Sequence, residues 1–251
     1  MEKINQLMRE WQKGTVKLSS TLQKMGYERE LLKKYVMSGW LESIGYGAFK
    51  ISGDDITWQG AINALQNQKN SKIHSGGKTA LILKGYSHYL GVSLNRVDLF
   101  GNTPETLPKW FKDNDWEVQV NYIQTKIFDY SNVDYYTTIL YKEFELLISS
   151  PELAAMEMLY LVPKVQSFDE AAKIMEGLTT LRPELIQRLL EQCNSVKVKR
   201  LFLFIAEKHD HTWMKELNLE RINLGSGKRS IVVDGVLNKK YQITIPREYA
   251  G

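Results

Sequence analysis

The sequence contains little of the chemistry from which metal proteins and disulfide-rich proteins are built. Its 251 residues include one cysteine, Cys193, so a disulfide framework or a multi-cysteine zinc cluster cannot form within one chain. The four histidines are scattered, and the closest two, His209 and His211, have no third ligand nearby in sequence. We therefore expect a reduced thiol in a core, no bound metal and no cofactor.

Long apolar runs are also absent. No stretch approaches the roughly 20 apolar residues that a membrane-spanning helix needs. The start of the chain, MEKINQLMREWQKG, alternates charged with apolar residues and lacks the apolar core of a signal peptide. With 43% hydrophobic and 11% aromatic residues, the chain can bury one or two ordinary cores. We expect a cytoplasmic protein that makes no contact with a membrane.

Complete catalytic motifs are missing too. The segment Gly77-Lys78-Thr79 ends like a phosphate-binding loop, but Lys72 occupies the position that requires a glycine. No Gly-x-Ser-x-Gly nucleophile motif occurs. Glu143 and Glu145 would share one face of a strand, without the basic partner typical of a nuclease. We predict no catalytic residues, and a nucleic-acid-processing enzyme remains the less favoured alternative.

Charge is distributed unevenly along a chain whose net charge is +4. Residues 1–90 carry +6, residues 91–192 carry −7 and residues 193–251 carry +5. A basic N-terminal part suits a polyanion, which the acidic middle would repel. Basic residues near the C-terminus could extend a DNA footprint or face a partner: Lys197, Lys199 and Arg200.

The first fifty residues show the element order of a winged helix-turn-helix. Apolar residues at helical spacing predict helices over 4–11, 18–25 and 27–38, with Gly26 between the second and third. Two short strands then flank a turn at Gly45-Tyr46-Gly47. Three short helices followed by a hairpin are typical of DNA-binding winged helices.

The candidate DNA contacts are the polar residues outside the apolar stripes of these helices. Cations one turn apart on the third helix can meet phosphates or guanine edges in a major groove. Polar residues of the preceding helix and of the wing suit phosphate or minor-groove contacts. The predicted contacts are Ser20, Thr21, Gln23 and Lys24 on the second helix, Arg29, Lys33 and Lys34 on the third, and Tyr46 and Lys50 on the wing.

The rest of the chain predicts an α+β protein, with a winged helix-turn-helix domain followed by a mixed α/β domain. We place the boundary near residue 92, so that residues 1–92 form the DNA-binding domain and 93–251 the C-terminal domain. Helices over 58–68 and 79–90 are expected to brace the winged module and to offer a dimer surface. The C-terminal domain is predicted to contain strands over 96–100, 117–128 and 137–140, helices over 150–161, 169–178, 182–193 and 198–207, and an antiparallel pair of 230–233 with 241–245.

Several blocks in the N-terminal part resemble the AbiEi-type antitoxins, which are transcriptional regulators of type IV toxin-antitoxin systems used in phage defence. The resemblance covers nearly the whole chain, although the C-terminal half matches mainly in pattern. The matching blocks are SGWLESIGYGAF at 38–49, WQGA at 58–61, ALQ at 64–66, IHSGGKTAL at 73–81 and GYSHYL at 85–90.

The resemblance implies a division of labour. The N-terminal module would bind inverted repeats in the promoter of its own operon and repress it, as a homodimer on double-stranded DNA. The C-terminal domain would counteract a nucleotidyltransferase toxin, without needing a stable complex with it. The sequence maps no antitoxic residue. A stand-alone winged-helix regulator, without a toxin gene beside it, is the main alternative.

Overall fold

The computed structural model describes residues 2–86 and 94–250, which separate into two compact units. The first unit comprises the described residues of 1–74, 94–124 and 138–147. The second unit comprises those of 75–93, 125–137 and 148–250. Each unit is therefore assembled from segments that alternate along the chain.

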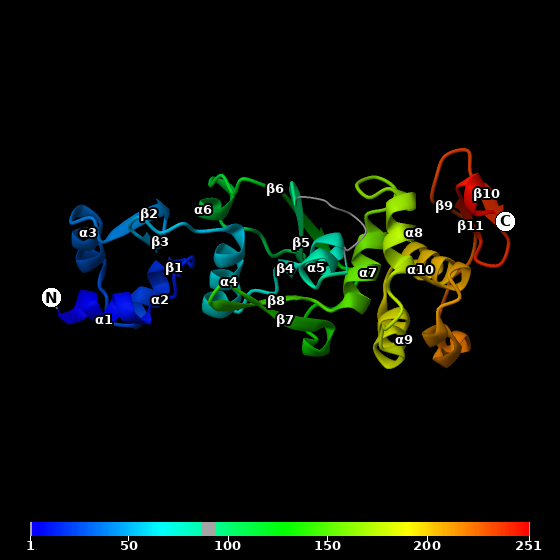
Figure 1. Cartoon of the computed structure of the whole chain (residues 1–251), viewed down its shortest axis with the longest axis horizontal. Coiled ribbons are helices and arrows are strands. Elements are labelled where there is room, and N and C mark those ends of the chain that lie inside the picture. The colour runs from blue at the N-terminus through cyan, green and yellow to red at the C-terminus, as the bar shows by residue number, and fades with distance from the viewer. Residues whose placement is uncertain (1, 87–93, 251) are drawn as a thin grey trace. The chain divides into compact units, whose positions relative to one another are not determined.

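The first unit begins with a winged helix-turn-helix, as predicted (Figure 1). A single apolar cluster from the first helix, the helix-turn-helix and the first wing strand holds it together, including Leu7, Trp11, Leu22, Leu32 and Leu41. The three strands lie in the order β1-β3-β2. The elements are α1 (Glu2–Glu10), β1 (Lys17–Leu18), α2 (Ser19–Lys24), α3 (Arg29–Met37), β2 (Leu41–Gly45) and β3 (Ala48–Ile51).

Two glycines fix the turns on either side of α3. Gly26 and Gly39 adopt φ of +87° and +74°. The following amides, of Tyr27 and Trp40, donate to carbonyls five residues earlier at 2.9 Å each. This is the Schellman arrangement, which ends a helix cleanly because glycine enters the left-handed region without a steric penalty. The direction of α3 is thus set locally.

Helix α4 (Trp58–Lys69) packs closely on the chain that leads into α2. A Cβ at Gly60 would lie 1.8 Å from the carbonyl oxygen of Gly14, so only glycine permits this approach. Gln68 binds the same segment, accepting from the amide of Leu18 at 2.8 Å and donating to the carbonyl of Val16 at 2.7 Å. Helix α4 therefore braces the winged module.

Helix α5 (Gly77–Leu83) belongs instead to the second unit, where it packs on α7 (Pro151–Tyr160). The predicted end of this helix, near residue 90, lies outside the described residues. A bracing role for the winged module thus falls on α4.

A five-stranded sheet follows the winged module, with most of its residues in the first unit. Its order is β6-β5-β4-β8-β7, and the short helix α6 (Lys109–Lys112) lies between β5 and β6 in the chain. The short strand β4, which the sequence pattern does not predict, pairs in parallel with β8, Ser75 opposite Ile148. Two residues are too few to show strand alternation. The strands are β4 (His74–Ser75), β5 (Arg96–Asn102), β6 (Gln119–Thr125), β7 (Tyr136–Tyr141) and β8 (Phe144–Ser149).

The second unit contains the four helices predicted for the C-terminal half. Serine hydroxyls cap three of them, since Ser150, Ser167 and Ser195 each accept from an amide in the first turn. Cys193 is buried, as expected, and burial raises the pKa of its thiol to about 11. The remaining elements here are α8 (Phe168–Glu176), α9 (Pro183–Gln192), α10 (Val196–Lys208) and the 3-10 turns η1 (Val133–Tyr135), η2 (Thr212–Glu216), η3 (Leu219–Arg221) and η4 (Arg247–Tyr249).

The last sheet differs from the predicted antiparallel pair. Strand β11 (Ile243–Ile245) pairs antiparallel with β10 (Val236–Asn238), whereas β9 (Arg229–Ser230) runs parallel to β11. The physical reason is proximity, because the side chain of Asn238 accepts from the amide of Tyr241 at 2.9 Å and closes a short hairpin. In residues 2–86 and 94–250, every helix is too short or too polar to cross a membrane.

Candidate nucleic-acid interface

A groove of about 1020 Å³ lies beside α3 in the first unit. Helices α2 and α3, the wing, the end of α4 and the start of α6 all contribute to its lining. The groove gathers five of the nine predicted DNA contacts: Ser20, Gln23, Arg29, Lys33 and Tyr46. The structure thus places the helix-turn-helix and the wing tip around one surface.

The other four predicted contacts, Thr21, Lys24, Lys34 and Lys50, do not line this groove. Lys50 is tied into the wing, because its amine lies 3.2 Å from a Glu42 carboxylate oxygen and donates to the carbonyl of Asp54 at 2.9 Å. Its side chain is only 21% exposed. The structure therefore gives Lys50 an internal role in the wing, which the charge pattern did not indicate.

Glu42 is the acceptor that organises this end of the wing. The amide of Gly53 and the hydroxyl of Ser52 both donate to it at 2.8 Å. These bonds, together with Lys50, lower the pKa of Glu42 to about 2. The carboxylate thus connects β2 to Lys50 of β3 and to the turn that follows β3.

The floor of the groove is apolar. Leu32, Val36, Phe49 and Trp110 contribute to it, and Met37 extends from α3 with 87% of its surface exposed. Tyr46 projects from the tip of the wing with 94% exposed. Two large apolar side chains in solvent on one surface are typical of a contact site for another molecule.

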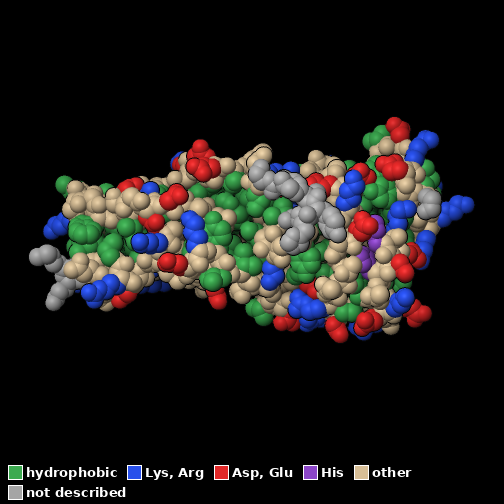
Figure 2. All heavy atoms as spheres, in the orientation of Figure 1, with side chains coloured by type: hydrophobic (Ala, Val, Ile, Leu, Met, Phe, Trp, Pro, Cys, Tyr) green, Lys and Arg blue, Asp and Glu red, His purple; other side chains and the backbone are tan. Residues whose placement is uncertain are grey.

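The cations of α3 lie at the edge of this groove. Arg29 is exposed, and Lys33 forms an ion pair with Glu30 at 2.8 Å across one helical turn. Figure 2 shows Lys and Arg side chains beside apolar ones on the part of the surface that α1–α3 occupy in Figure 1. An exposed pair of this kind is weak, so Lys33 is free to exchange Glu30 for a phosphate.

Helix α6 reaches the groove from a later part of the sequence. A Cβ at Gly45 would lie 2.7 Å from that of Trp110, so the wing strand β2 and α6 are in close contact. Asn114 donates to the carbonyl of Ile44 at 2.8 Å and to that of Trp110 at 2.6 Å. This contact brings Lys109 to the groove, and Lys69 of α4 also lines it. The sequence indicated neither lysine, because no local pattern relates these segments to α3.

The expectation for the C-terminal cations is wrong for Lys197 and Arg200. The Arg200 side chain is 3% exposed, and its guanidinium donates to four backbone carbonyls at 2.6–3.2 Å, those of Leu224, Gly225, Gly227 and Gln242.

Lys197 donates to the carbonyls of Tyr160, the last residue of α7, and of Val162 at 2.8 and 2.6 Å. Lys199 is also buried. The donors of Lys197 and Arg200 are used within the fold and are not directed at a partner.

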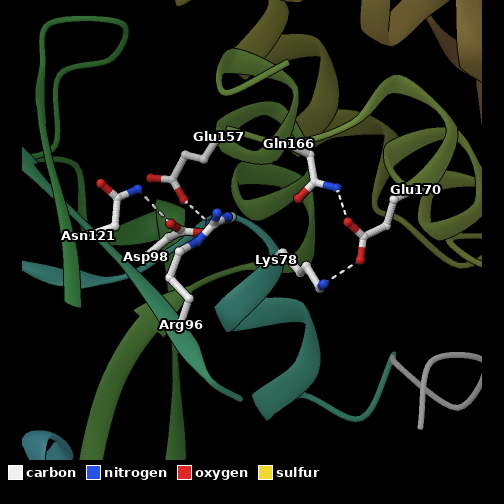
Figure 3. Close-up of polar contacts among 8 residues, drawn as sticks. Lys78, Arg96, Asp98, Asn121, Glu157, Gln166 and Glu170 are labelled. Carbon is white, nitrogen blue, oxygen red and sulfur yellow. Dashed lines mark hydrogen bonds and ion pairs between the residues drawn. The ribbon is translucent and has the colours of Figure 1, made fainter. Parts of the chain in front are cut away.

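Two further polar networks appear in Figure 3, one in each unit. Asp98 accepts from Arg96 at 3.3 Å and from Asn121 at 2.7 Å in the first unit. In the second unit, Glu170 accepts from Lys78 and from Gln166. Lys78, which stands where a phosphate-loop lysine would, therefore binds a carboxylate of its own chain.

Carboxylates and histidines do not assemble further. Glu143 and Glu145 line a second groove of about 500 Å³ whose other polar residues are mostly amides. In the part of the chain that the structure describes, no three residues of the His, Cys, Asp or Glu type are grouped to hold a metal.

The fold and the groove define a class of protein, a winged helix-turn-helix module joined to an α/β region. The profile of the family described as "Transcriptional regulator, AbiEi antitoxin N-terminal domain" matches residues 1–92. That of "Transcriptional regulator, AbiEi antitoxin, Type IV TA system" matches residues 94–246. The chain belongs to this family, whose descriptions name antitoxins and transcriptional regulators and no enzyme class.

A solved structure has a similar fold. It is the RV2827C protein from Mycobacterium tuberculosis, with a TM-score of 0.63 and 14% sequence identity over 96% of this chain and 89% of that chain. No protein of curated function matches this chain.

Proposed function

We propose that this protein represses its own operon by binding inverted repeats in the promoter, with α3 in a major groove and the wing against the flanking backbone. In this proposal it acts in the cytoplasm, and two copies occupy the two half-sites, about 34 Å or a multiple apart. Its C-terminal part counteracts a nucleotidyltransferase toxin without a stable complex. The observation that carries the DNA proposal is the groove shared by α2, α3 and the tip of the wing.

The side chains around this groove suit DNA in kind and in position. Arg29 and Lys33 lie one turn apart on the exposed face of α3, where they can reach phosphates or guanine edges. Ser20 and Gln23 of α2 add short hydrogen-bonding groups for the backbone. Tyr46, held out in solvent by the turn at Gly45 and Gly47, would lie against the backbone or reach a minor groove.

Titration of a labelled upstream fragment tests the DNA proposal. We expect Arg29→Ala/Lys33→Ala to weaken binding about tenfold or more and to reduce the magnitude of the slope of log K against log salt by about 1.8 per bound copy, because each phosphate contact contributes about 0.9. The control is Lys215→Ala/Arg247→Ala, which removes the same charge from exposed positions of the second unit. Equal affinity of the two double variants would contradict the assignment of α3.

The antitoxin proposal is tested by co-expression with the adjacent open reading frame. We expect that frame to encode a nucleotidyltransferase whose expression arrests growth, and this chain to restore growth. Arg29→Ala/Lys33→Ala should restore growth as well, because the cations of α3 serve DNA and not the toxin. A neighbouring gene of another kind would favour a stand-alone regulator.

A further inference from the structure

The groove beside α3 has a second basic edge that the helix-turn-helix and the wing do not supply. Lys69 lies in the last turn of α4, and Lys109 is the first residue of α6, with 82% of its side chain exposed. Both line the same groove as Arg29 and Lys33.

We propose that Lys69 and Lys109 bind phosphates of the DNA, so that the DNA-binding surface includes a helix from beyond residue 92. This inference rests on the proposed function and extends it to α4 and α6. It assigns to the groove one occupant, the sugar-phosphate backbone of a duplex strand.

The position of Lys109 is fixed by the wing. Trp110, the next residue, is 4% exposed and packs against Gly45, while Asn114 binds the carbonyl of Ile44. The backbone of α6 is therefore held against β2, next to the turn that presents Tyr46. A strand that contacts the tip of the wing would pass near the amine of Lys109.

The chemistry of the groove matches a sugar-phosphate backbone. Its floor of Leu32, Val36, Phe49 and Trp110 suits the apolar faces of deoxyribose, and four cations, Arg29, Lys33, Lys69 and Lys109, match the phosphates. An uncharged apolar ligand would have no use for four cations. Charge complementarity thus favours the nucleic acid as occupant.

The pairing of Lys109 leaves it available to a phosphate. It binds Asp113 at 2.5 Å, four residues later on the surface, and Asp113 is itself 54% exposed. Exposed pairs of this spacing contribute little, because solvent screens them and both side chains lose freedom. A phosphate, which carries more charge and releases counterions from DNA, can replace the carboxylate.

Two double variants of equal charge test the inference on the full-length protein with a labelled upstream fragment. Lys69→Ala/Lys109→Ala removes the groove lysines. Lys72→Ala/Lys112→Ala removes lysines three residues later in the same segments, which line other pockets. We expect the first variant to reduce the magnitude of the salt slope by about 1.8 per bound copy and affinity about tenfold or more, and the second to change the slope by less than about 0.5 per bound copy.

The outcomes separate this inference from the proposed function. Equal losses in the two double variants would overturn the inference and would reveal only a general effect of charge. Normal binding by Lys69→Ala/Lys109→Ala beside a loss in Arg29→Ala/Lys33→Ala would also overturn it, while leaving the role of α3 intact. If the wild type does not bind the fragment in a salt-dependent manner, the proposed function fails together with the inference.

Asp113→Asn gives a test in the opposite direction. Removing the carboxylate that competes for Lys109 should raise affinity about twofold to fivefold, and the same substitution in a Lys109→Ala background should have no effect. A gain that persists without Lys109 would contradict the proposed contact. Thermal unfolding of each variant confirms that a change in binding does not reflect a change in folding.

Discussion

The two basic regions of this protein use their cations in opposite ways. In the first unit, Arg29 and Lys33 stand in solvent at the edge of a groove. In the second unit, Lys197 and Arg200 direct their donors into backbone carbonyls. The two segments have similar net charges in the sequence. A count of cations therefore predicts a binding surface only when the hydrogen-bond partners of those cations are known.

The difference arises from what each cation faces. The segment around Gly225 presents carbonyls that have no strand partner, and burial of a carbonyl without a partner is costly. The guanidinium of Arg200, with five donors in a plane, binds three of them, those of Leu224, Gly225 and Gly227, and also reaches the carbonyl of Gln242. The residues on α3 face no such carbonyls, because their own helix satisfies its backbone. Arg29 and Lys33 therefore remain exposed to a ligand, and Lys33 has only a weak surface pair with Glu30 to exchange.

Removing one arginine from each region tests most directly whether Arg200 stabilises the fold while Arg29 does not. Arg200→Ala removes the guanidinium donor from the carbonyls of Leu224, Gly225 and Gly227, so we expect the free energy of unfolding to fall by about 3–5 kcal/mol. Arg29→Ala, on an exposed surface, should change it by less than about 0.5 kcal/mol. Urea unfolding followed by circular dichroism measures both. A similar small loss in the two variants would show that the carbonyls near Gly225 do not depend on Arg200.

A smaller effect on the free energy of unfolding is expected for the corresponding pair of lysines, Lys197 and Lys33. Lys197→Met keeps the apolar stem beside Tyr160 and removes two hydrogen bonds. The free energy of unfolding should therefore fall by about 1–3 kcal/mol. Lys33→Met is the matched exposed change and should be nearly neutral in stability while weakening DNA binding. The same urea unfolding, alongside a DNA titration, distinguishes the two. If Lys197→Met weakened DNA binding and left stability unchanged, Lys197 would serve DNA binding and not the fold, which would contradict the contrast with Lys33.

Features of the fold that depend on local sequence patterns could be predicted, and those that depend on distant contacts could not. The order of α1, α2, α3 and the wing follows from apolar spacing and from glycines such as Gly26 and Gly39, so it was predictable. The four long helices of the second unit follow in the same way. Strands β1 and β4 were missed because two residues show no period. The pairing of β9 with β11 depends on contacts between distant segments, which a single sequence does not display.

The same distinction between local patterns and distant contacts applies to the candidate site. Arg29, Lys33 and Tyr46 were recognised because they share a helix face or a turn with a known pattern. Lys69 and Lys109 were not, because α4 and α6 reach the groove only through tertiary packing such as that of Trp110 on Gly45. Lys50 was assigned to DNA because its pairing with Glu42 is invisible in the sequence.

Unlike Arg29 and Lys33, Lys50 is bound within the fold, and the pH dependence of stability tests its pairing with Glu42. The pKa of Glu42, lowered to about 2, lies below its ordinary value of 4.5, so its charged form stabilises the fold above pH 4.5 and this contribution is lost as the pH falls to about 2. Glu42→Gln should therefore make stability depend less on pH across that window. Urea midpoints at several pH values measure the slope; an unchanged slope would mean that the carboxylate does not organise the wing.

The smallest expected effect concerns Glu30, which competes for Lys33. Glu30→Gln frees that amine, so DNA affinity should rise about twofold to fivefold at low salt, and the gain should shrink as salt increases. Glu28→Gln is the matched control, because Glu28 precedes α3 and lies outside the groove lining. An equal gain in both would indicate a general effect of net charge.

The two units alternate along the chain, and this limits how the proposed repression and antitoxic action can be separated genetically. The family profiles meet between residues 92 and 94, but the side chains of Asn63 and Gln66 in α4 donate to the carbonyls of Glu145 and Leu147. A gene cut at that junction would deprive α4 of those acceptors and would remove α6 from the wing. The proposed repression and antitoxic action are therefore best tested separately by point substitutions in an intact gene. Chimaeras of related regulators would have to exchange α6 together with the wing that it contacts.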